Sequence, residues 1–569
     1  MARSLCSLVL VLWAASATLL QLQLRTASSA AVPNVLMLIV DDLRPELEPY
    51  GFNSISSPNI KDFAKTAAQF NSAYCQYSLC APSRSSFLTG LRPQTTQVFD
   101  AHRYFRNTPG LNNTVTLPQF FKNQGYRVAG GGKIFHPGLA SGGDNDGVSW
   151  TEPYYTAPGK HRFEAKTVSW QARSEAESDF PDYKVASNAI QQLQSLKNDK
   201  FFIAMGLHKP HLPFVFPQSY LDRYPLPVAL ADDTSPPTDL SNIAWSNYAE
   251  LRGYQDIANL NLRRGQGNWM PDSKAAELRR AYWAATSFVD DQIGRVLTEL
   301  RTLGLDQNTT VVLLSDHGWH LGDMAEWGKG TTFEPANRVV LMIRDPSRST
   351  TAGARISTNV ELLDVYPTLV DIANYEIPAT LQGKSLTPLL SGEEAPSTWK
   401  DASFSQILRA SNAFASSPLM GYTVRTESWR YTEWVSYDTA TGLTDWDDVQ
   451  SVELFDHRDD PRTIFGYSER VNLAADTNYH TVREELSALL RTQTSVNTDM
   501  PIHELTDAPT SEESTSNPPP TPSESVTSSP VESPSQPSTT ASSVTTPCAN
   551  CGGRQRRPGR RRGKNGGRS

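Results

Sequence analysis

The chain has 569 residues, a formal net charge of −8 at pH 7 and only five cysteines. This length exceeds what one ordinary hydrophobic core can hold, so we expect one large domain and a smaller one. With Cys6 in the N-terminal leader, too few cysteines remain to form a disulfide framework. The acidic balance of the chain favours no nucleic-acid partner.

Residues 1–30 have the features of a secretory signal peptide. Arg3 supplies a positive charge, residues 5–20 are mostly apolar, and small residues at 28–30 form a cleavage site. No later segment approaches the roughly 18 apolar residues that a spanning helix needs, so we predict no permanent membrane anchor. The sequons at Asn112 and Asn308 agree with a secretory-pathway protein, in the lysosome or outside the cell.

Residues 31–400 alternate short apolar runs with amphipathic stretches. We predict strands at 34–40, 201–206, 310–314 and 338–343, and helices at 58–70, 117–123, 184–196, 275–303 and 360–373. This alternation is typical of an α/β domain whose mostly parallel sheet is covered by helices on both faces.

A smaller domain is expected at 401–505. We predict strands at 421–426, 429–435 and 452–455 and a helix at 480–492, which together indicate a short antiparallel sheet with a packed helix.

Residues 506–569 have a different composition. Ser, Thr and Pro dominate to about residue 547, which predicts a disordered stalk. Cys548 and Cys551 follow, a pair that favours a local or intermolecular disulfide over zinc. Eight Lys and Arg residues then lie between 554 and 568. This basic end either tethers the acidic body to polyanionic matrix or is a solvated tail without a partner.

The most informative motif is Cys80-Ala81-Pro82-Ser83-Arg84, followed by residues 85–90 with the sequence SSFLTG. Pro82 suits the first turn of a helix, which places Cys80 at a helix N-terminus, where backbone N–H groups favour anions. Arg84 supplies the positive charge that an ionised nucleophile needs. The alternative is a buried cysteine beside a helix that begins near a proline.

Polar side chains follow several predicted strands. Asp41 and Asp42 follow the first strand, and in open α/β sheets ligands bind outside the carboxyl ends of strands. We therefore expect the following residues to meet at one rim: Asp41, Asp42, Lys133, His136, His208, Asp316 and His317. Taken alone, the aspartate pair could also cap a helix or face solvent. Three carboxylates with an imidazole favour Ca²⁺ or Mg²⁺ over zinc, and the secretory pathway favours Ca²⁺.

These motifs resemble the type I sulfatases of the alkaline-phosphatase-like superfamily, and within it the iduronate-2-sulfatase group. The resemblance covers about residues 34–476 and includes residues 40–45, 80–90, 132–138, 208–211, 315–319, 420–426 and 429–432. His317 favours the iduronate group, because many sulfatases have Asn at that position whereas the iduronate group has His.

The resemblance implies a mechanism and a set of site residues. Cys80 is oxidised to formylglycine by a formylglycine-generating enzyme, and the hydrated aldehyde attacks the sulfur of a sulfate ester. The residues that ligate one Ca²⁺ are Asp41, Asp42, Cys80, Asp316 and His317. The sulfate is contacted by Lys133, His136, His208 and Lys329, and Arg84 supports the nucleophile.

The implied substrate is a sulfated glycan, first the 2-sulfate of iduronate in dermatan or heparan sulfate. Other sulfated polysaccharides and aryl sulfates fit the same chemistry. A non-catalytic matrix protein that binds sulfated glycans through the pocket is the alternative from another class. Trp319 either stacks on a sugar ring or belongs to the core. The chain has no cysteine between Cys80 and Cys548, so family disulfides in that interval are lost.

Overall fold

The computed structural model describes residues 33–496, except 160–165, 247, 263–268, 392–395, 398 and 410–416. Contacts within the chain divide it into one unit that ends at Ala508 and a second that begins at Pro509, and all described residues belong to the first. The predicted signal peptide, the stalk, Cys548 and Cys551 lie outside the described residues. Within the described part, no helix has both the length and the apolar character needed to cross a membrane.

A seven-stranded sheet forms the centre of the larger part, in the order β12-β2-β11-β8-β1-β6-β4. β1 pairs in parallel with both β6 and β8, and β6 pairs in parallel with β4. β11 pairs antiparallel with β8 and β2, so it is the one strand of this sheet that runs against the others. The strands are β1 (Asn34–Val40), β2 (Ala68–Phe70), β4 (Arg127–Gly132), β6 (Phe201–Leu207), β8 (Thr309–Ser315), β11 (Leu341–Arg344) and β12 (Arg355–Ile356).

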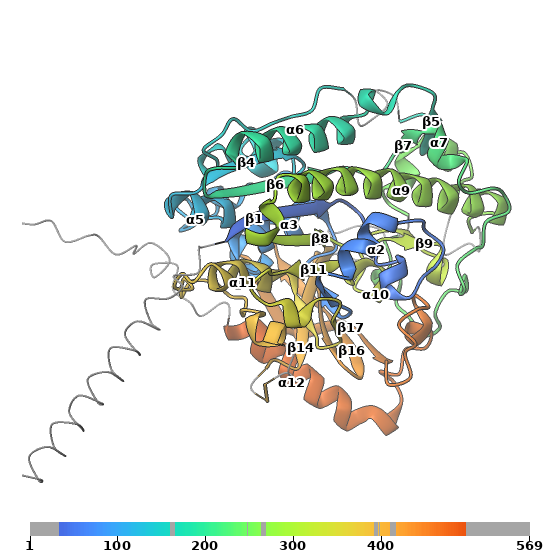
Figure 1. Ribbon diagram of the computed structural model, residues 1–569. Helices are drawn as coiled ribbons and strands as arrows, with labels where there is room; N and C mark the ends of the chain where they lie inside the picture. The colour runs from blue at the N-terminus through green and yellow to red at the C-terminus, as the bar shows by residue number, and fades with distance from the viewer. Residues whose placement is uncertain are drawn as a thin grey trace, which may run out of the picture. The chain divides into compact units, whose positions relative to one another are not determined.

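Helices cover both faces of this sheet (Figure 1). Leu36 and Leu38 of β1 pack in one core with α2 (Pro58–Ala64), α6 (Pro181–Leu196) and α9 (Asp272–Thr302). Met37, between them, packs in the other core with α3 (Cys80–Thr89), α5 (Leu117–Asn123) and α11 (Val365–Ile372). Successive side chains of a strand point to opposite faces, so an unbroken apolar run such as β1 fills two cores.

A second sheet is antiparallel, in the order β14-β15-β16-β17, with α12 (His480–Val496) packed on it. Its strands are β14 (Ala402–Arg409), β15 (Leu419–Thr426), β16 (Trp429–Asp438) and β17 (Leu443–Asp456). The backbone N–H of Gln406 in β14 donates to Gln76 O at 3.0 Å. This sheet therefore attaches to the segment that leads into Cys80.

Short elements complete the described part. The strands are β3 (Ala73–Tyr74) with β13 (Val360–Glu361), β5 (Trp170–Arg173) with β7 (Phe214–Pro217), and β9 (His320–Leu321) with β10 (Trp327–Gly328). The helices are α4 (Pro93–Thr96), α7 (Gln218–Leu221), α8 (Gln255–Ala258) and α10 (Glu334–Asn337).

The predicted fold class is confirmed: a mostly parallel sheet between helices, and a separate antiparallel sheet with a helix. The strands expected at 34–40, 201–206 and 310–314 are present to within one residue. The helix predicted at 58–70 is wrong in its second half, because it ends at Ala64 and Ala68–Phe70 is β2. The helix predicted at 360–373 begins instead with β13 and a 3₁₀ turn, and β14 was missed.

Candidate active site

The carboxyl ends of three parallel strands of the central sheet deliver polar side chains to one rim. Asp41 and Asp42 follow β1, Asp316 and His317 follow β8, and Lys133 follows β4. Asp42 has a positive φ of 59°, a conformation that Asp tolerates better than most residues. Its backbone N–H donates to Asp316 Oδ1 at 3.1 Å, which fixes the two aspartates relative to each other. The ends of β1 and β8 therefore bring the aspartates of both strands together.

Cys80 is the first residue of α3 and lies at the centre of this rim. Its Sγ lies 3.2 Å from Lys329 Nζ, 3.3 Å from His317 Nε2 and 3.5 Å from Lys133 Nζ. Burial, together with the negative charge of Asp41, raises the pKa of the Cys80 thiol well above its usual value. An unmodified Cys80 is therefore a neutral thiol near pH 7, which is a poor nucleophile.

Arg84 lies one turn along α3 and joins the ends of the three strands. Its guanidinium donates to Asp41 Oδ1 and to Asp316 Oδ2, each at 2.9 Å. It also donates to the carbonyl oxygens of Lys133 and, at 2.9 Å, of Ile134. The Arg84 side chain is fully buried, so it orients the two aspartates from the protein interior and is not accessible to a substrate.

The donor set fits a divalent cation. Ligand atoms of Asp41, Cys80, Asp316 and His317 lie within 4.8 Å of one another. Asp42 Oδ2 is buried and has no hydrogen-bond partner among the described residues. Burial, with Asp41 and Asp316 close by, raises the pKa of Asp42 well above its usual value in spite of Lys329. A cation would relieve this crowding of carboxylates.

His317 supports the same interpretation. Its Nδ1 lies 2.8 Å from Gly318 O. A carbonyl only accepts, so Nδ1 carries the proton and a neutral ring leaves a lone pair on Nε2. Nε2 lies 3.3 Å from Asp42 Oδ1 and 3.5 Å from Asp316 Oδ2. Burial lowers the pKa of His317 to about 4. A lone pair beside two carboxylates is the arrangement that a bound cation requires.

The two lysines place positive charge on both sides of Cys80. Lys133 forms an ion pair with Asp41, and Lys329 Nζ lies 2.6 Å from Asp42 Oδ1. Burial alone would lower the pKa of each lysine, but the aspartate partners raise both pKa values above normal. Both ammonium groups therefore stay charged beside Cys80.

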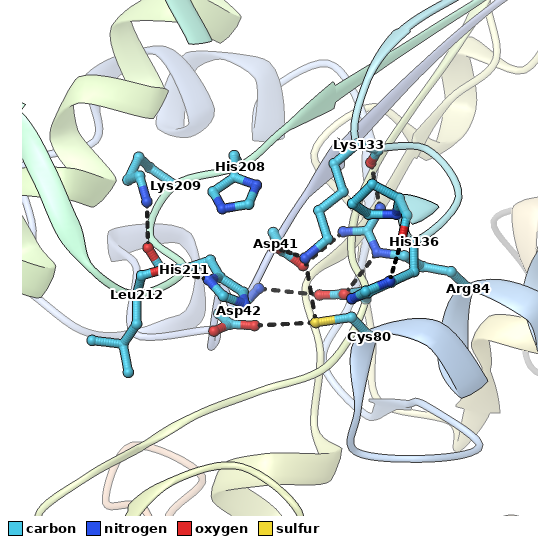
Figure 2. A network of polar contacts seen from close by, with 12 residues as sticks. Asp41, Asp42, Cys80, Arg84, Lys133, His136, His208, Lys209, His211 and Leu212 are labelled. Carbon is cyan, nitrogen blue, oxygen red and sulfur yellow. Dashed lines mark hydrogen bonds and ion pairs between the residues drawn. The ribbon is translucent and has the colours of Figure 1, made fainter. Parts of the chain in front are cut away.

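The predicted histidines lie on two sides of the aspartate pair. Figure 2 shows His208 on one side, and His136 on the other together with Lys133, Arg84 and Cys80. Burial and Lys133 lower the pKa of His136 to about 3, and its Nδ1 lies 3.0 Å from Pro137 O. His136 is therefore a neutral ring with a free Nε2 lone pair.

Sequence reasoning missed two residues of this site. His211 lies in the quoted motif 208–211 but received no role, and its ring centroid is 4.9 Å from that of His208. Glu250 contacts both Lys329 and His211 and has no local signal in the sequence. Trp319 is fully buried and packs edge-on against Phe214, so it belongs to the core rather than to a sugar-binding surface.

Comparison with known proteins decides the family. The Sulfatase family model matches residues 33–375, and a model described as N-sulphoglucosamine sulphohydrolase, C-terminal, matches residues 322–495. The chain belongs to the sulfatase family. It is 33% identical over 496 residues to iduronate 2-sulfatase of Mus musculus, covering 75% of this chain and 89% of that protein. It is therefore a sulfuric ester hydrolase.

Two solved structures share the fold of this sulfatase. One is described as a 2-O GAG sulfatase, with a TM-score of 0.63 and 20% identity over 82% of this chain and 93% of that one. The other is a phosphonate monoester hydrolase from Silicibacter pomeroyi, with a TM-score of 0.64 and 20% identity over 82% of this chain and 96% of that one. Because the fold serves both reactions, the substrate must be argued from the site and from the closer relative.

Proposed function

We propose that this sulfatase hydrolyses the 2-sulfate of iduronate in dermatan and heparan sulfate. One observation carries the proposal: Cys80 Sγ lies within 3.5 Å of Lys133 Nζ, Lys329 Nζ and His317 Nε2, beside a buried group of three aspartates. The 33% identity to a mouse iduronate 2-sulfatase supports the choice of sugar.

A metal ion and a modified side chain would complete the site. One Ca²⁺ would be held by Asp41, Asp42, Asp316, His317 and residue 80, and it would neutralise charge on a bound sulfate. Oxidation of Cys80 to formylglycine would supply a hydrated aldehyde as the nucleophile toward sulfur. The raised pKa of the Cys80 thiol agrees with this, because the unmodified residue is not ionised.

The chain's own residues bind the sulfate and move the protons. The Lys133 and Lys329 ammonium groups receive the sulfate oxygens from two sides of residue 80. His208 or Lys329 gives a proton to the leaving sugar oxygen as its bond to sulfur breaks. After the sulfate has been transferred to residue 80, His136 would remove the proton of the second diol hydroxyl through its Nε2 lone pair, so that the aldehyde re-forms and sulfate leaves.

The first experiment tests the nucleophile. Mass spectrometry of the peptide that contains Cys80 should find formylglycine in protein made with the converting enzyme. Cys80→Ala should keep the melting temperature but release no sulfate. An unmodified thiol in active protein, or activity in Cys80→Ala, would overturn the mechanism. An unmodified thiol in inactive protein that binds sulfated glycans would instead indicate the matrix-protein alternative.

The second experiment tests the substrate. Sulfate release is measured on disaccharides that carry one sulfate each, at iduronate position 2 or at hexosamine positions, and on an aryl sulfate. The proposal predicts the highest kcat/KM for the iduronate 2-sulfate. Preference for a hexosamine sulfate or an aryl sulfate would refute the substrate and leave the chemistry intact.

The regions outside the described residues carry the remaining proposals. Residues 1–30 direct the chain to the secretory pathway, and from there to the lysosome or the cell exterior. The basic residues 554–568 bind polyanionic matrix through their eight positive charges.

A further inference from the structure

Glu250 belongs to a segment that is fixed to the loop carrying Lys329. The backbone N–H of Tyr248 donates to Glu326 Oε1 at 3.0 Å, and its hydroxyl donates to Ala325 O at 2.7 Å. Glu326 Oε1 also accepts the backbone N–H of Trp327, the first residue of β10. Since Lys329 directly follows β10, these bonds set the distance between Glu250 and Lys329.

One carboxylate spans two groups of the active site. Glu250 Oε2 lies 3.3 Å from Lys329 Nζ, and Oε1 lies 3.4 Å from His211 Nε2. The Glu250 side chain keeps 28% of its surface exposed, whereas that of Lys329 keeps 6%. Lys329 is therefore held between Glu250 at the open side of the site and Asp42 at the buried side.

A carboxylate at this position is unfavourable for binding alone. It repels an anionic sulfate ester, so it must serve another step of the reaction. Without Glu250, the Lys329 ammonium would keep only Asp42 as a carboxylate partner within 4 Å among the described residues, and His211 Nε2 would lose its acidic partner. Both groups could then turn away from the substrate.

We propose that Glu250 is a positioning residue that directs Lys329 and His211 toward the oxygen of the leaving group. The proposal rests on the proposed function, in which a proton reaches that oxygen as the S–O bond breaks. The bonding electron pair stays on the leaving oxygen. That oxygen takes the proton from Lys329, which Glu250 contacts, or from His208, whose ring centroid lies 4.9 Å from that of His211. Solvent then returns a proton to the donor. A phenolate leaves without this help, whereas a sugar alkoxide needs it.

The test compares leaving groups. Glu250→Gln and Glu250→Asp are assayed on the sulfated disaccharide and on 4-nitrophenyl sulfate, with melting temperature and formylglycine content measured for each variant. We expect Glu250→Gln to lower kcat on the sugar sulfate roughly 10- to 100-fold, the usual effect of a misplaced group. On the aryl sulfate the loss should stay below about threefold, KM for the sugar should not rise, and Glu250→Asp should recover part of the rate.

A matched control is Glu277→Gln, which removes an ion pair with Lys274 at 3.0 Å on the surface of α9. It should retain the wild-type rates. Equal losses on both substrates, or no loss on the sugar sulfate, would overturn the role of Glu250 while wild-type activity still supports the proposed function. A wild-type protein that is fully formylglycine-modified but hydrolyses neither substrate would refute the proposed function and this inference together.

Discussion

Glu453 is expected to make the protein more stable in mild acid than at neutral pH. It lies on β17 and is fully buried, with Oε1 accepting the indole N–H of Trp434 at 2.7 Å. Oε2 is buried and has no hydrogen-bond partner among the described residues. Burial, with a smaller contribution from Glu469, raises the pKa of Glu453 to about 7 against the opposing effects of the Trp434 hydrogen bond and of Arg409 and Arg430.

The sign and size follow from this pKa. The unfolded chain ionises Glu453 near pH 4.5, whereas the folded protein holds the proton to about pH 7. Between these values the folded state binds more protons, so stability falls as pH rises, by about 3 kcal/mol once pH exceeds 7. With about 2 cal/mol/K of unfolding entropy per residue over roughly 460 folded residues, this corresponds to about 3 °C in Tm.

Glu453→Gln isolates this contribution. The glutamine stays neutral at every pH and its carbonyl can still accept from Trp434. Thermal unfolding at a fixed scan rate and calcium concentration should give similar Tm values for both proteins near pH 4.5. At pH 8 the variant should unfold about 3 °C above the wild type. Glu427→Gln, an exposed change in the turn of the same sheet, serves as the control. A Tm difference that stays constant with pH, or one that favours the wild type at pH 8, would refute this account.

Three further predictions concern the site and the tail. Arg84→Lys should lower Tm by several degrees, because an ammonium cannot span two carboxylates and two carbonyls. Each lost charged hydrogen bond costs about 1.5–3 kcal/mol. A decrease in Tm of less than about 1 °C would contradict this prediction. Ca²⁺ at about 100 times its Kd should stabilise the protein by about 2.7 kcal/mol in a thermal scan, and Asp42→Ala should remove that effect. A chain that ends at Ala508 should lose salt-sensitive retention on a heparin column while keeping its rate on a disaccharide; unchanged retention would refute matrix binding by the tail.

The strands that carry the site were predictable because they are buried on both faces. β1 and β8 contain apolar runs at 35–40 and 311–314, and acidic residues follow both strands, so the strand and the polar residues after it are predictable from the local sequence. The helix expected at 58–70 fails for the opposite reason. Gln69 in β2 pairs with Met342 and Arg355, which are distant in the chain, and this pairing overrides the local pattern.

Glu250 shows the limit of motif reasoning at the site. It lies in a segment of short 3₁₀ turns without hydrophobic periodicity, and its partners His211 and Lys329 are distant in the chain. Only the three-dimensional contacts reveal that it belongs to the active site. His211 did carry a signal, since it shares a four-residue motif with His208, but the motif alone does not say which imidazole faces the substrate.

The antiparallel sheet is part of the catalytic framework and not an appendage. Glu334 at the start of α10 accepts from Arg430 of β16 at 2.5 Å and from Arg425 of β15 at 3.3 Å. Ligand atoms of Glu334, His457 and Glu469 come within 4.8 Å of one another, but the arginines already neutralise this cluster, which leaves no need for a metal ion.

The same short helix supports the two loops that carry His317 and Lys329. Pro335 O and Ala336 O accept the backbone N–H groups of Trp319 and Gly318, at 2.7 and 2.8 Å, immediately after His317. Asn337 donates to Thr331 O at 3.0 Å, two residues after Lys329. Anchoring α10 to the antiparallel sheet therefore fixes the positions of the His317 imidazole and the Lys329 ammonium relative to Cys80. This is a physical reason for a sulfatase to keep its second sheet even where that sheet touches no substrate.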